Sequence, residues 1–342
     1  MSKTREIKKE LVMSYKPPFS INAKIINLLS LVSEKIGELS SLKKQPFKLR
    51  KSSRIKTLAG TLQIEGNTLD EEKITAILEG KRVLATPKEV AEARGAIELY
   101  DMMQELDFKS QKDLLKSHKI LMQELLEDNG HYRMTNVGVG GQNGVTHVAP
   151  PYDRVPDLMR DLFKWLEGCD EHPLIKSSVF HYEFEFIHPF SDGNGRMGRF
   201  WQSLILYNYK EIFANIPIES MVRQRQDEYY KALEDSGSAG ESTPFVEYML
   251  EVILDTIKDV EKENIPNNAQ QNAQQNAQEI LNEMAKDKYI TIKQLSVICK
   301  LGTRTVQKII NELKEQNKIK RVGANKGGYW EVSVNMTEKT DD

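Results

Sequence analysis

The chain has 342 residues, of which 39% are hydrophobic and 29% are charged, and its formal net charge is −2. This length allows two or three domains, and the near-neutral charge gives no overall attraction to nucleic acid or to membranes. No stretch approaches the roughly 18 apolar residues of a membrane span, and the two distant cysteines, Cys169 and Cys299, exclude a disulfide framework.

The first residues, Met-Ser-Lys-Thr-Arg-Glu, are not followed by the apolar core of a signal peptide. Together with two isolated cysteines, which suit a reducing compartment, this predicts a cytoplasmic location.

The N-terminal part of the chain is predicted to be helical. Residues 1–20 are polar and contain prolines, which indicates an extended arm. Apolar residues at helical spacing predict helices over 21–42 and 53–64, and Gly66 suits a C-terminal cap of the second.

Three capping patterns predict the next helix starts. Thr68 stands three residues before Glu71, and Thr86, followed by a proline, stands three residues before Glu89. A similar pattern at Ser110 opens a helix predicted to reach about residue 127.

The pattern of residue types changes between residues 130 and 151. Two short β-branched runs flank Gly-Gln-Asn-Gly within residues 137–148, which predicts a β-hairpin. Helices are then predicted over 156–167 and 173–187. His147 has no second histidine at metal-ligand spacing, so no metal is assigned to it.

The stretch most suggestive of chemistry is His188-Pro-Phe-Ser-Asp-Gly-Asn-Gly-Arg-Met-Gly-Arg199. Pro189 disfavours helix at His188, so the preceding helix should end there. A tight loop follows, with two glycines free to adopt positive φ, and then a new helix begins. The N-terminus of a helix attracts anions because its N–H groups are unpaired and its dipole end is positive.

The side chains of this stretch fit a phosphate-transfer site. Arg196 and Arg199 lie on one face of the first helical turns and could bind a polyphosphate. Asp192 is a suitable ligand for a Mg²⁺ that bridges phosphates, and His188 is suited to act as a general base.

Other interpretations fit this stretch less well. Gly193-x-Gly195-x-x-Gly198 has the dinucleotide-binding spacing, but no second parallel strand follows, although residues 182–186 alternate as a strand would. A calcium loop beginning at Asp192 would need a glutamate where Ser203 stands. A structural glycine turn with solvent-facing arginines is the remaining alternative.

The helix after the glycine loop is predicted to reach about residue 213. A further helix over 221–233 and another over 243–260 follow. Residues 264–278 consist almost entirely of Asn, Gln and Ala with little to bury, which indicates a linker, although this composition could also extend a helix.

The C-terminal segment has the pattern of a winged helix-turn-helix. Helices are predicted over 279–285, 291–299 and 304–313, followed by a hairpin of residues 318–322 and 328–332. Residues 287–332 contain ten Lys/Arg and four Asp/Glu, a balance of +6, which suggests DNA contact. A solvated basic surface or a protein-docking module is the equal alternative. The candidate DNA-contacting residues are Arg304, Thr305, Lys308, Lys320, Arg321 and Lys326.

Residues 188–199 resemble the signature of the Fic family, H-x-F-x-[DE]-G-N-G-R-x-x-R, and meet every fixed position. The resemblance implies a mostly helical core that transfers AMP from ATP to a hydroxyl of a target protein. It implies that His188 deprotonates this hydroxyl, that Asp192 holds Mg²⁺, and that Phe190 anchors the loop in the core. It also implies a set of phosphate-binding residues: Gly193, Asn194, Gly195, Arg196 and Arg199.

A second resemblance concerns Thr61-Leu-Gln-Ile-Glu65-Gly66, which is similar to the inhibitory motif [ST]-x-x-x-E-[GN] found N-terminal to many Fic cores. It implies that Glu65 pairs with Arg199 and occupies the guanidinium that the γ-phosphate of ATP needs. The alternative is an exposed glutamate with no special role.

Two further features are interpreted through the family. The predicted hairpin resembles the flap that aligns a target segment by strand addition, with Val145, Thr146, His147 and Val148 as candidate docking residues; a surface hairpin without a partner is the alternative. Tyr229 and Tyr230 are candidates for the pocket of the nucleotide base, and core packing is the equal alternative.

The expected fold class is mainly α: an all-helical Fic core with a β-hairpin flap and a small C-terminal winged helix-turn-helix domain. The expected divisions are residues 1–84 (N-terminal helical region with the inhibitory motif), 85–262 (Fic core), 263–278 (linker), 279–334 (winged helix) and 335–342 (tail).

The expected function is an autoinhibited protein adenylyltransferase that uses ATP and Mg²⁺ and modifies a Ser, Thr or Tyr of a target protein or of itself. The alternatives are transfer of another phosphoryl or nucleotidyl group, removal of AMP, and a DNA-binding regulator with a nucleotide-sensing core. The candidate partners are a target protein, DNA at the C-terminal domain and a second copy of the chain; no membrane partner is expected.

Overall fold

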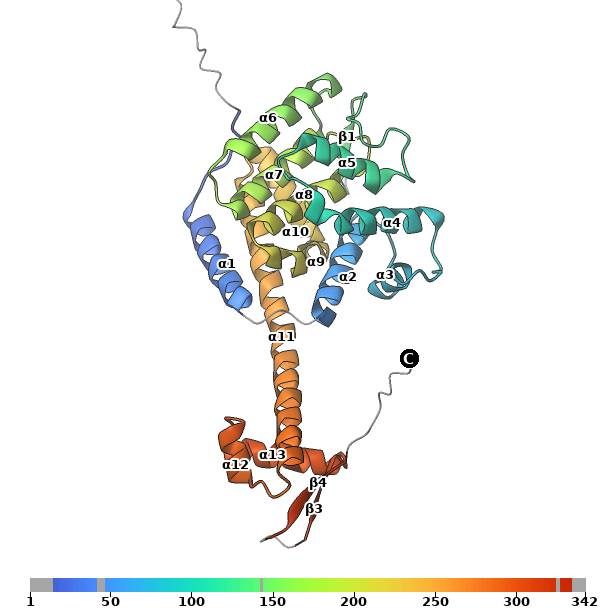
Figure 1. Ribbon diagram of the computed structural model, residues 1–342. Helices are drawn as coiled ribbons and strands as arrows, with labels where there is room; N and C mark the ends of the chain where they lie inside the picture. Colours follow the sequence, from blue (N-terminus) through green and yellow to red (C-terminus); the bar gives the residue numbers. More distant parts are fainter. Residues whose placement is uncertain (1–14, 42–46, 142–143, 324–326, 334–342) are drawn as a thin grey trace, which may run out of the picture. The chain divides into compact units, whose positions relative to one another are not determined.

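The structure is a computed structural model that describes residues 15–41, 47–141, 144–323 and 327–333. It divides into two compact units, unit 1 (Met1–Val260) and unit 2 (Glu261–Asp342). Helices dominate both units, and each contains one two-stranded antiparallel sheet (Figure 1). The prediction of a mainly helical fold is confirmed. The predicted boundary at residue 262 lies two residues from the end of unit 1.

Unit 1 carries most of the helices, and the three short 3₁₀ turns are labelled η. Its elements are, in chain order, α1 (Ala23–Ser41), α2 (Phe47–Ile64), α3 (Glu71–Leu78), α4 (Pro87–Asp101), η1 (Met103–Glu105), α5 (Gln111–Met122), β1 (Gly138–Gly141), β2 (Gly144–Val148), η2 (Tyr152–Arg154), α6 (Val155–Gly168), α7 (Pro173–Ile187), α8 (Asn194–Tyr209), η3 (Glu211–Asn215), α9 (Ile218–Gln224), α10 (Gln226–Ala239) and the first part of α11 (Thr243–Lys286).

Helices α7 and α8 pack against each other in the middle of unit 1 (Figure 1). Gly198 allows this close approach, because a Cβ there would lie 2.9 Å from His181 Cδ2 and 3.0 Å from Glu185 Oε1. Phe180 and Trp201 are fully buried around this contact. The strand-like alternation of residues 182–186 therefore belongs to a helix that is buried on most sides.

The helix starts follow the predicted caps with one correction. Thr86 forms the complete capping box with Glu89, and the Ser110 side chain accepts a hydrogen bond from the Asp113 N–H. The box predicted at Thr68 is wrong, because Asp70 caps α3 and the Thr68 hydroxyl donates to Glu89 instead. Thr68 thus pairs with the distant Glu89 rather than with Glu71 in a local capping box.

Three predicted helix ends also differ. Helix α5 ends at Met122 rather than near residue 127, and α8 ends at Tyr209 and is followed by η3. The helix predicted over 221–233 is two helices, α9 and α10, because the backbone of Arg225 leaves the helical region between them. The remaining predicted helices of unit 1 agree within a few residues, apart from the earlier start of α2 and the continuation of α11 beyond residue 260 to Lys286.

Helix α2, which precedes Glu65, packs tightly against α9. A Cβ at Gly60 would lie 2.6 Å from the Ser220 N and 2.7 Å from the Glu219 carbonyl carbon. Glu219 is fully buried and accepts hydrogen bonds from Tyr100 (2.9 Å) and Ser203 (2.7 Å). Burial raises the pKa of this carboxyl group above its ordinary value. The end of α2 is therefore held on a closely packed surface of the core.

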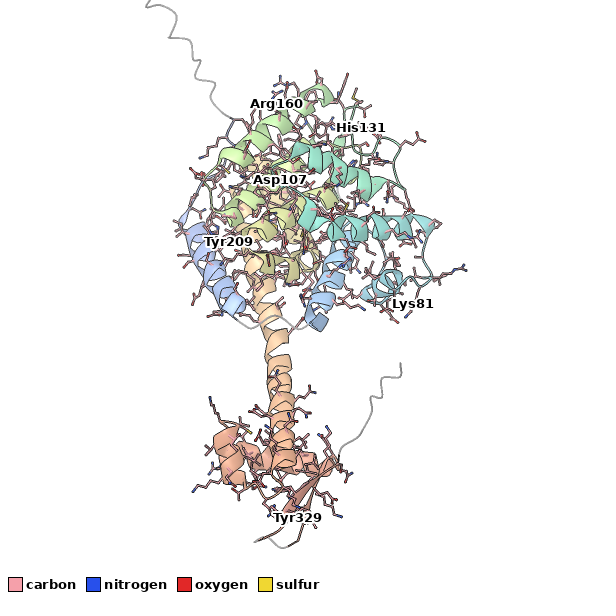
Figure 2. The ribbon with its side chains drawn as sticks, in the orientation of Figure 1. Lys81, Asp107, His131, Arg160, Tyr209 and Tyr329 are labelled. Atoms are coloured by element: carbon pink, nitrogen blue, oxygen red, sulfur yellow. The ribbon has the colours of Figure 1, made fainter. Side chains whose placement is uncertain are left out.

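The N-terminal arm is described from residue 15 onward, and residues 15–22 lie outside any helix, as predicted. Its Tyr15 hydroxyl donates to Glu183 on α7 (2.6 Å), and its Pro18 carbonyl accepts from the Ser242 N–H (2.8 Å). Charged side chains such as Lys81 and Arg160 lie at the periphery of unit 1 (Figure 2).

Unit 2 contains the end of α11, α12 (Ile292–Ile298), α13 (Thr303–Glu315), β3 (Ile319–Val322) and β4 (Tyr329–Val332). The strands pair in register from Ile319 opposite Val332 to Val322 opposite Tyr329. Buried Trp330 holds the hairpin on the helices, since its indole N–H donates to the Ile290 carbonyl (3.0 Å). This is the predicted order of elements, with Lys326 outside the described residues. The predicted linker is helical, as its alanine content allowed.

No helix in the described part of the chain is long and apolar enough to cross a membrane.

Candidate active site

His188 occupies the junction between α7 and the glycine loop. As Pro189 predicts, the helix ends at Ile187, and His188 adopts a left-handed conformation (φ 50°, ψ 61°). This conformation costs a non-glycine residue about 1 kcal/mol. Its Nδ1 is buried and has no hydrogen-bond partner within the described residues. The imidazole is thus held in a specific position without having its hydrogen-bonding capacity filled.

Arg133 holds the backbone in this position. Its guanidinium donates to the carbonyl oxygens of His188 (2.8 Å), Thr135 (2.8 Å) and Pro150 (2.5 Å), and its own N–H donates to the Pro189 carbonyl (2.9 Å). The first contact fixes the left-handed turn, and the other two fix the segments that lead into and out of the β1–β2 hairpin. Arg133 therefore joins the position of the imidazole to that of the hairpin.

We expect Arg133→Ala to lower the free energy of unfolding by about 3 kcal/mol or more, because several buried carbonyl groups lose their donor. Arg133→Lys should recover only part of this loss, since an ammonium group cannot reach all three carbonyls at once. Urea denaturation of both variants measures the effect. An exposed arginine on α6, Arg160, supplies a control, and equal stability of the Arg160→Ala and Arg133→Ala variants would contradict this role.

The loop between His188 and α8 is closed by Asn194. Its side-chain oxygen accepts from the Phe190 N–H and its amide donates to the Phe190 carbonyl, both at 2.9 Å. Phe190 is fully buried and stacks on His118 with a centroid distance of 3.7 Å. Phe190 thus lies where it was expected. The Asn194 side chain fastens the loop, and its predicted contact with phosphates stays a prediction.

His118 on α5 packs against the same loop. Its Nδ1 accepts from the Gly130 N–H (2.9 Å), and its Nε2 lies 3.0 Å from the Asp192 carbonyl oxygen. These partners require a neutral ring with the proton on Nε2. Burial lowers the pKa of His118 from 6.5 to about 4, so the folded protein keeps the neutral form.

This depressed pKa predicts a loss of stability in mild acid. Below pH 6.5 the unfolded chain binds a proton at His118 that the folded chain does not, so stability falls with pH until about pH 4. Between pH 7 and 5 the loss is about 2 kcal/mol. Urea unfolding of wild type and His118→Gln at both pH values checks this. Equal pH dependence of the two proteins would contradict it.

Helix α8 begins at Asn194, directly after the loop. Gly193 precedes it with φ 82° and provides no side-chain cap, so the first N–H groups of the helix are not satisfied by a capping side chain. Gly195, expected to be a second positive-φ position, is already helical. Its role is steric, since a Cβ there would collide with the Glu65 carboxylate.

Asp192 lies two residues before the N-terminus of α8. Its side chain is 57% exposed, and its Oδ1 accepts from the Gly193 N–H (2.6 Å) and lies 3.7 Å from an Arg196 nitrogen. The described residues contain no group of three or more His, Cys, Asp or Glu that could hold a metal. A single exposed carboxylate fits Mg²⁺, which is commonly held by one or two carboxylates, phosphates and water.

Arg196 is almost fully buried, with 4% of its side chain exposed. Its Nε and one terminal nitrogen have no hydrogen-bond partner in the described part of the chain. The nearest carboxylate oxygens, those of Asp192 and Glu92, lie 3.7 Å away, beyond hydrogen-bond distance. A buried guanidinium with free donors is a site prepared for an anion.

Arg199 is bound by α2. Its side chain is 3% exposed and donates to Glu65 Oε1 (2.6 Å) and to both the hydroxyl and carbonyl oxygens of Thr61 (3.2 Å each). Burial alone would lower its pKa, but the Glu65 carboxylate raises the pKa of this guanidinium above its ordinary value. The ion pair expected between residues 65 and 199 is therefore present.

The two candidate base-pocket tyrosines lie in different environments. Tyr229 is buried with its hydroxyl 3.1 Å from His181 Nε2, which matches the core-packing alternative. Tyr230 is 41% exposed, and its hydroxyl accepts from Gln226 (3.1 Å), which also donates to the Ile64 carbonyl. Only Tyr230 is thus available to a ligand, next to the end of α2.

The predicted hairpin is present as β1 and β2, with a register shift after Val139. Val145, Thr146 and His147 lie in β2, and their side chains fall outside the described residues. Val148 at its end is 75% exposed. The predicted hairpin is therefore present, and its docking role stays a prediction.

The candidate DNA-contacting residues that the structure describes lie on α13 and β3. Arg304, Lys308 and Lys320 are exposed, and Lys308 lies 3.9 Å from Glu312. Arg321 is half-buried and stacks over Trp330, 4.7 Å from the ring centroid. It therefore supports the hairpin as well as adding charge.

Sequence reasoning missed residues that act through distant contacts, namely Arg133, Glu92, His118 and Gln226. No local pattern marks them, because each meets its partner far along the chain. Thr61 could have been found, since it occupies the first position of the inhibitory motif, but only its Glu65 was assigned a role.

The family model described as Fic/DOC family matches residues 107–206. A protein adenylyltransferase Fic of Aedes aegypti is 27% identical over 235 residues, which are 64% of this chain and 45% of that protein. Protein adenylyltransferase fic-1 of Caenorhabditis elegans is 31% identical over 203 residues, 55% of this chain and 37% of the relative. The chain spans less than half the length of these curated relatives.

A solved structure matches nearly the whole chain. The crystal structure of a Fic family protein from Desulfovibrio desulfuricans G20 is 38% identical, covers 93% of this chain and 98% of that chain, and has a TM-score of 0.73. A C. elegans Fic-1 structure, 22% identical with a TM-score of 0.57, agrees in fold alone. With the His188–Arg199 signature at the centre of a shared fold, the chain belongs to the Fic/DOC family.

Proposed function

We propose that this protein is an autoinhibited adenylyltransferase that transfers AMP from ATP to a hydroxyl group of a target protein or of itself. The observation that carries the proposal is the buried pair Arg196 and Arg199 beside an uncapped helix N-terminus, with His188 at the opposite end of the loop. The named relatives are adenylyltransferases, which supports the same activity here.

The transfer begins with deprotonation of the target hydroxyl. Neutral His188 accepts the proton as the oxygen attacks the α-phosphorus of ATP. A new oxygen–phosphorus bond forms, the bond from the α-phosphorus to the β-phosphate oxygen breaks, and pyrophosphate leaves. The left-handed turn fixed by Arg133 orients the ring for this step.

The remaining residues neutralise charge on the leaving group. The first N–H groups of α8 face the inner phosphates, and the free donors of Arg196 and, once released, those of Arg199 bind the outer ones. Mg²⁺ held at Asp192 would supply further neutralisation of the phosphates when bound.

The hairpin is the proposed site for the target. An extended segment that pairs with β2 would bring its hydroxyl toward His188, since Arg133 connects both elements. Val145, Thr146, His147 and Val148 would contact this segment, and Tyr230 would contact the adenine base.

The test uses ATP labelled at the α- or the γ-phosphorus. Purified Glu65→Gly protein is incubated with Mg²⁺ and a lysate, and the label retained on protein is counted. We expect retention of the α-label only. Retention of the γ-label would instead support phosphoryl transfer. Release of AMP from an already modified protein, with no retention of either label, would support removal of AMP.

We propose a second function, DNA binding by a winged helix in unit 2. It is supported by the first two turns of α13, Thr303 to Lys308, which contain two cations, no acidic residue and mostly exposed side chains. Lys320 adds an exposed cation on the following strand. Such a surface suits contact with DNA phosphates.

Binding of the full-length protein to a labelled 20-base-pair duplex tests this function at several salt concentrations. We expect affinity to fall as salt rises, and Arg304→Ala and Lys308→Ala to weaken it, with Lys293→Ala on α12 as the control. Absence of salt-dependent binding, or equal effects of all three variants, would favour a protein-docking module.

A further inference from the structure

A buried carboxylate outside both motifs connects the two arginine sites. Glu92 lies on α4, and its side chain is 10% exposed. Its two oxygens face different partners. Oε1 lies 3.7 Å from a terminal nitrogen of Arg196 and 3.9 Å from the exposed Lys88 ammonium group, and Oε2 accepts a hydrogen bond from the Asn67 amide (2.8 Å). One side chain therefore contacts Arg196 on α8 and the segment that follows Glu65.

Glu92 attracts the Arg196 guanidinium but accepts no hydrogen bond from it. At 3.7 Å the charges attract, but no hydrogen bond forms, and the Nε and NH1 groups of Arg196 stay free. Asp192 is equally near, but it is 57% exposed and its charge is screened by solvent. Glu92 is thus the buried negative charge nearest to the Arg196 guanidinium.

The contact with Asn67 fixes the chain just after the inhibitory glutamate. Asn67 stands two residues beyond Glu65, after the turn at Gly66 (φ 84°). Its side chain is buried, accepts from the Leu69 N–H (2.9 Å), and donates to Glu92 and to a neighbouring carbonyl of α4. The end of α2 is therefore anchored to α4 through the same carboxylate that faces Arg196.

We propose that Glu92 is a positioning residue that aims Arg196 at the outer phosphates of the nucleotide and anchors the segment following Glu65. This inference rests on the proposed function. It makes the two signature arginines interdependent, because movement of α2 away from Arg199 also disturbs the carboxylate that holds Arg196.

The competing electrostatic effect gives the proposal a sharp test. Glu92 is an anion close to an anion-binding site, so removing its charge would strengthen phosphate binding if mere repulsion dominated. If positioning dominates, removing the charge releases Arg196 and weakens binding. The sign of the change in affinity therefore decides between the two.

The experiment measures dissociation constants of Mg·ATP and of AMP by calorimetry in the Glu65→Gly protein. Glu92→Gln keeps an acceptor for Asn67 but removes the charge that faces Arg196. We expect it to weaken Mg·ATP binding about 10-fold and to leave AMP binding unchanged, since AMP lacks the outer phosphates. Glu98→Gln, an exposed glutamate on the same helix, is the matched control.

Two further variants complete the test. In a protein that already carries Arg196→Ala, Glu92→Gln should weaken Mg·ATP binding little further, because Glu92 acts by positioning that arginine. Glu92→Asp keeps the charge and should recover part of the affinity, which a merely structural role would not predict. It also serves if Glu92→Gln fails to fold. Asn67→Ala in the otherwise wild-type chain should raise basal transfer, because the end of α2 is released.

Unchanged or tighter Mg·ATP binding by Glu92→Gln, or additive losses with Arg196→Ala, would overturn the proposal. These outcomes differ from failure of the proposed function, in which the Glu65→Gly parent itself would bind no Mg·ATP.

Discussion

Replacing His188 by alanine in the Glu65→Gly protein is expected to abolish adenylyl transfer, with a loss of about 10²–10⁴-fold or more. The target hydroxyl then has no base to accept its proton. Affinity for Mg·ATP should stay nearly unchanged, because the phosphate contacts come from α8 and its arginines. Retained α-label measures transfer, and calorimetry measures binding.

His131→Ala is the matched control for this variant, because His131 is an exposed histidine on the loop after α5. It should leave transfer and binding unchanged. Transfer by His188→Ala within about tenfold of its parent would mean that another group takes the proton.

Replacing Glu65 by glycine is expected to raise transfer on the order of 10- to 100-fold, because a charge-assisted hydrogen bond of about 1.5–3 kcal/mol no longer competes for Arg199. The rise should be accompanied by tighter Mg·ATP binding, since the γ-phosphate can use the freed guanidinium. The transfer rate of Glu65→Gln, which keeps a neutral acceptor, should lie between those of wild type and Glu65→Gly.

The same substitution should also change stability. Arg199 is 3% exposed, and without Glu65 the oxygens of Thr61 are its remaining hydrogen-bond partners among the described residues. Thermal unfolding should therefore occur at a lower temperature, and Mg·ATP should raise this temperature more in Glu65→Gly than in wild type. An unchanged transfer rate and an unchanged response to Mg·ATP would contradict inhibition by Glu65.

Much of the fold could be predicted because its signals are local. Pro189 ends α7 through its own ring, Thr86 and Glu89 form their capping box within one turn, and helical spacing of apolar residues marks most helices. The glycine loop and both arginines follow from the signature alone. In each case the chemistry that determines the structure lies within a few residues.

The failures share the opposite cause. Thr68 does not cap α3 as predicted, because its hydroxyl donates a hydrogen bond to Glu89, twenty-one residues away. The hydrogen bonds of the Asn194 side chain to Phe190 were not predicted. Arg133 contacts residues as distant in the chain as His188 and Pro189. Contacts of this kind depend on how helices pack, which a single sequence does not specify.

The most direct measurement is a crystal structure of the Glu65→Gly protein with Mg²⁺ and a non-hydrolysable ATP analogue. The account predicts phosphates at the N-terminus of α8, with the γ-phosphate within hydrogen-bond distance of Arg199 and the α-phosphorus facing His188. An empty loop under saturating nucleotide, or a nucleotide bound elsewhere with Arg196 and Arg199 unengaged, would contradict it.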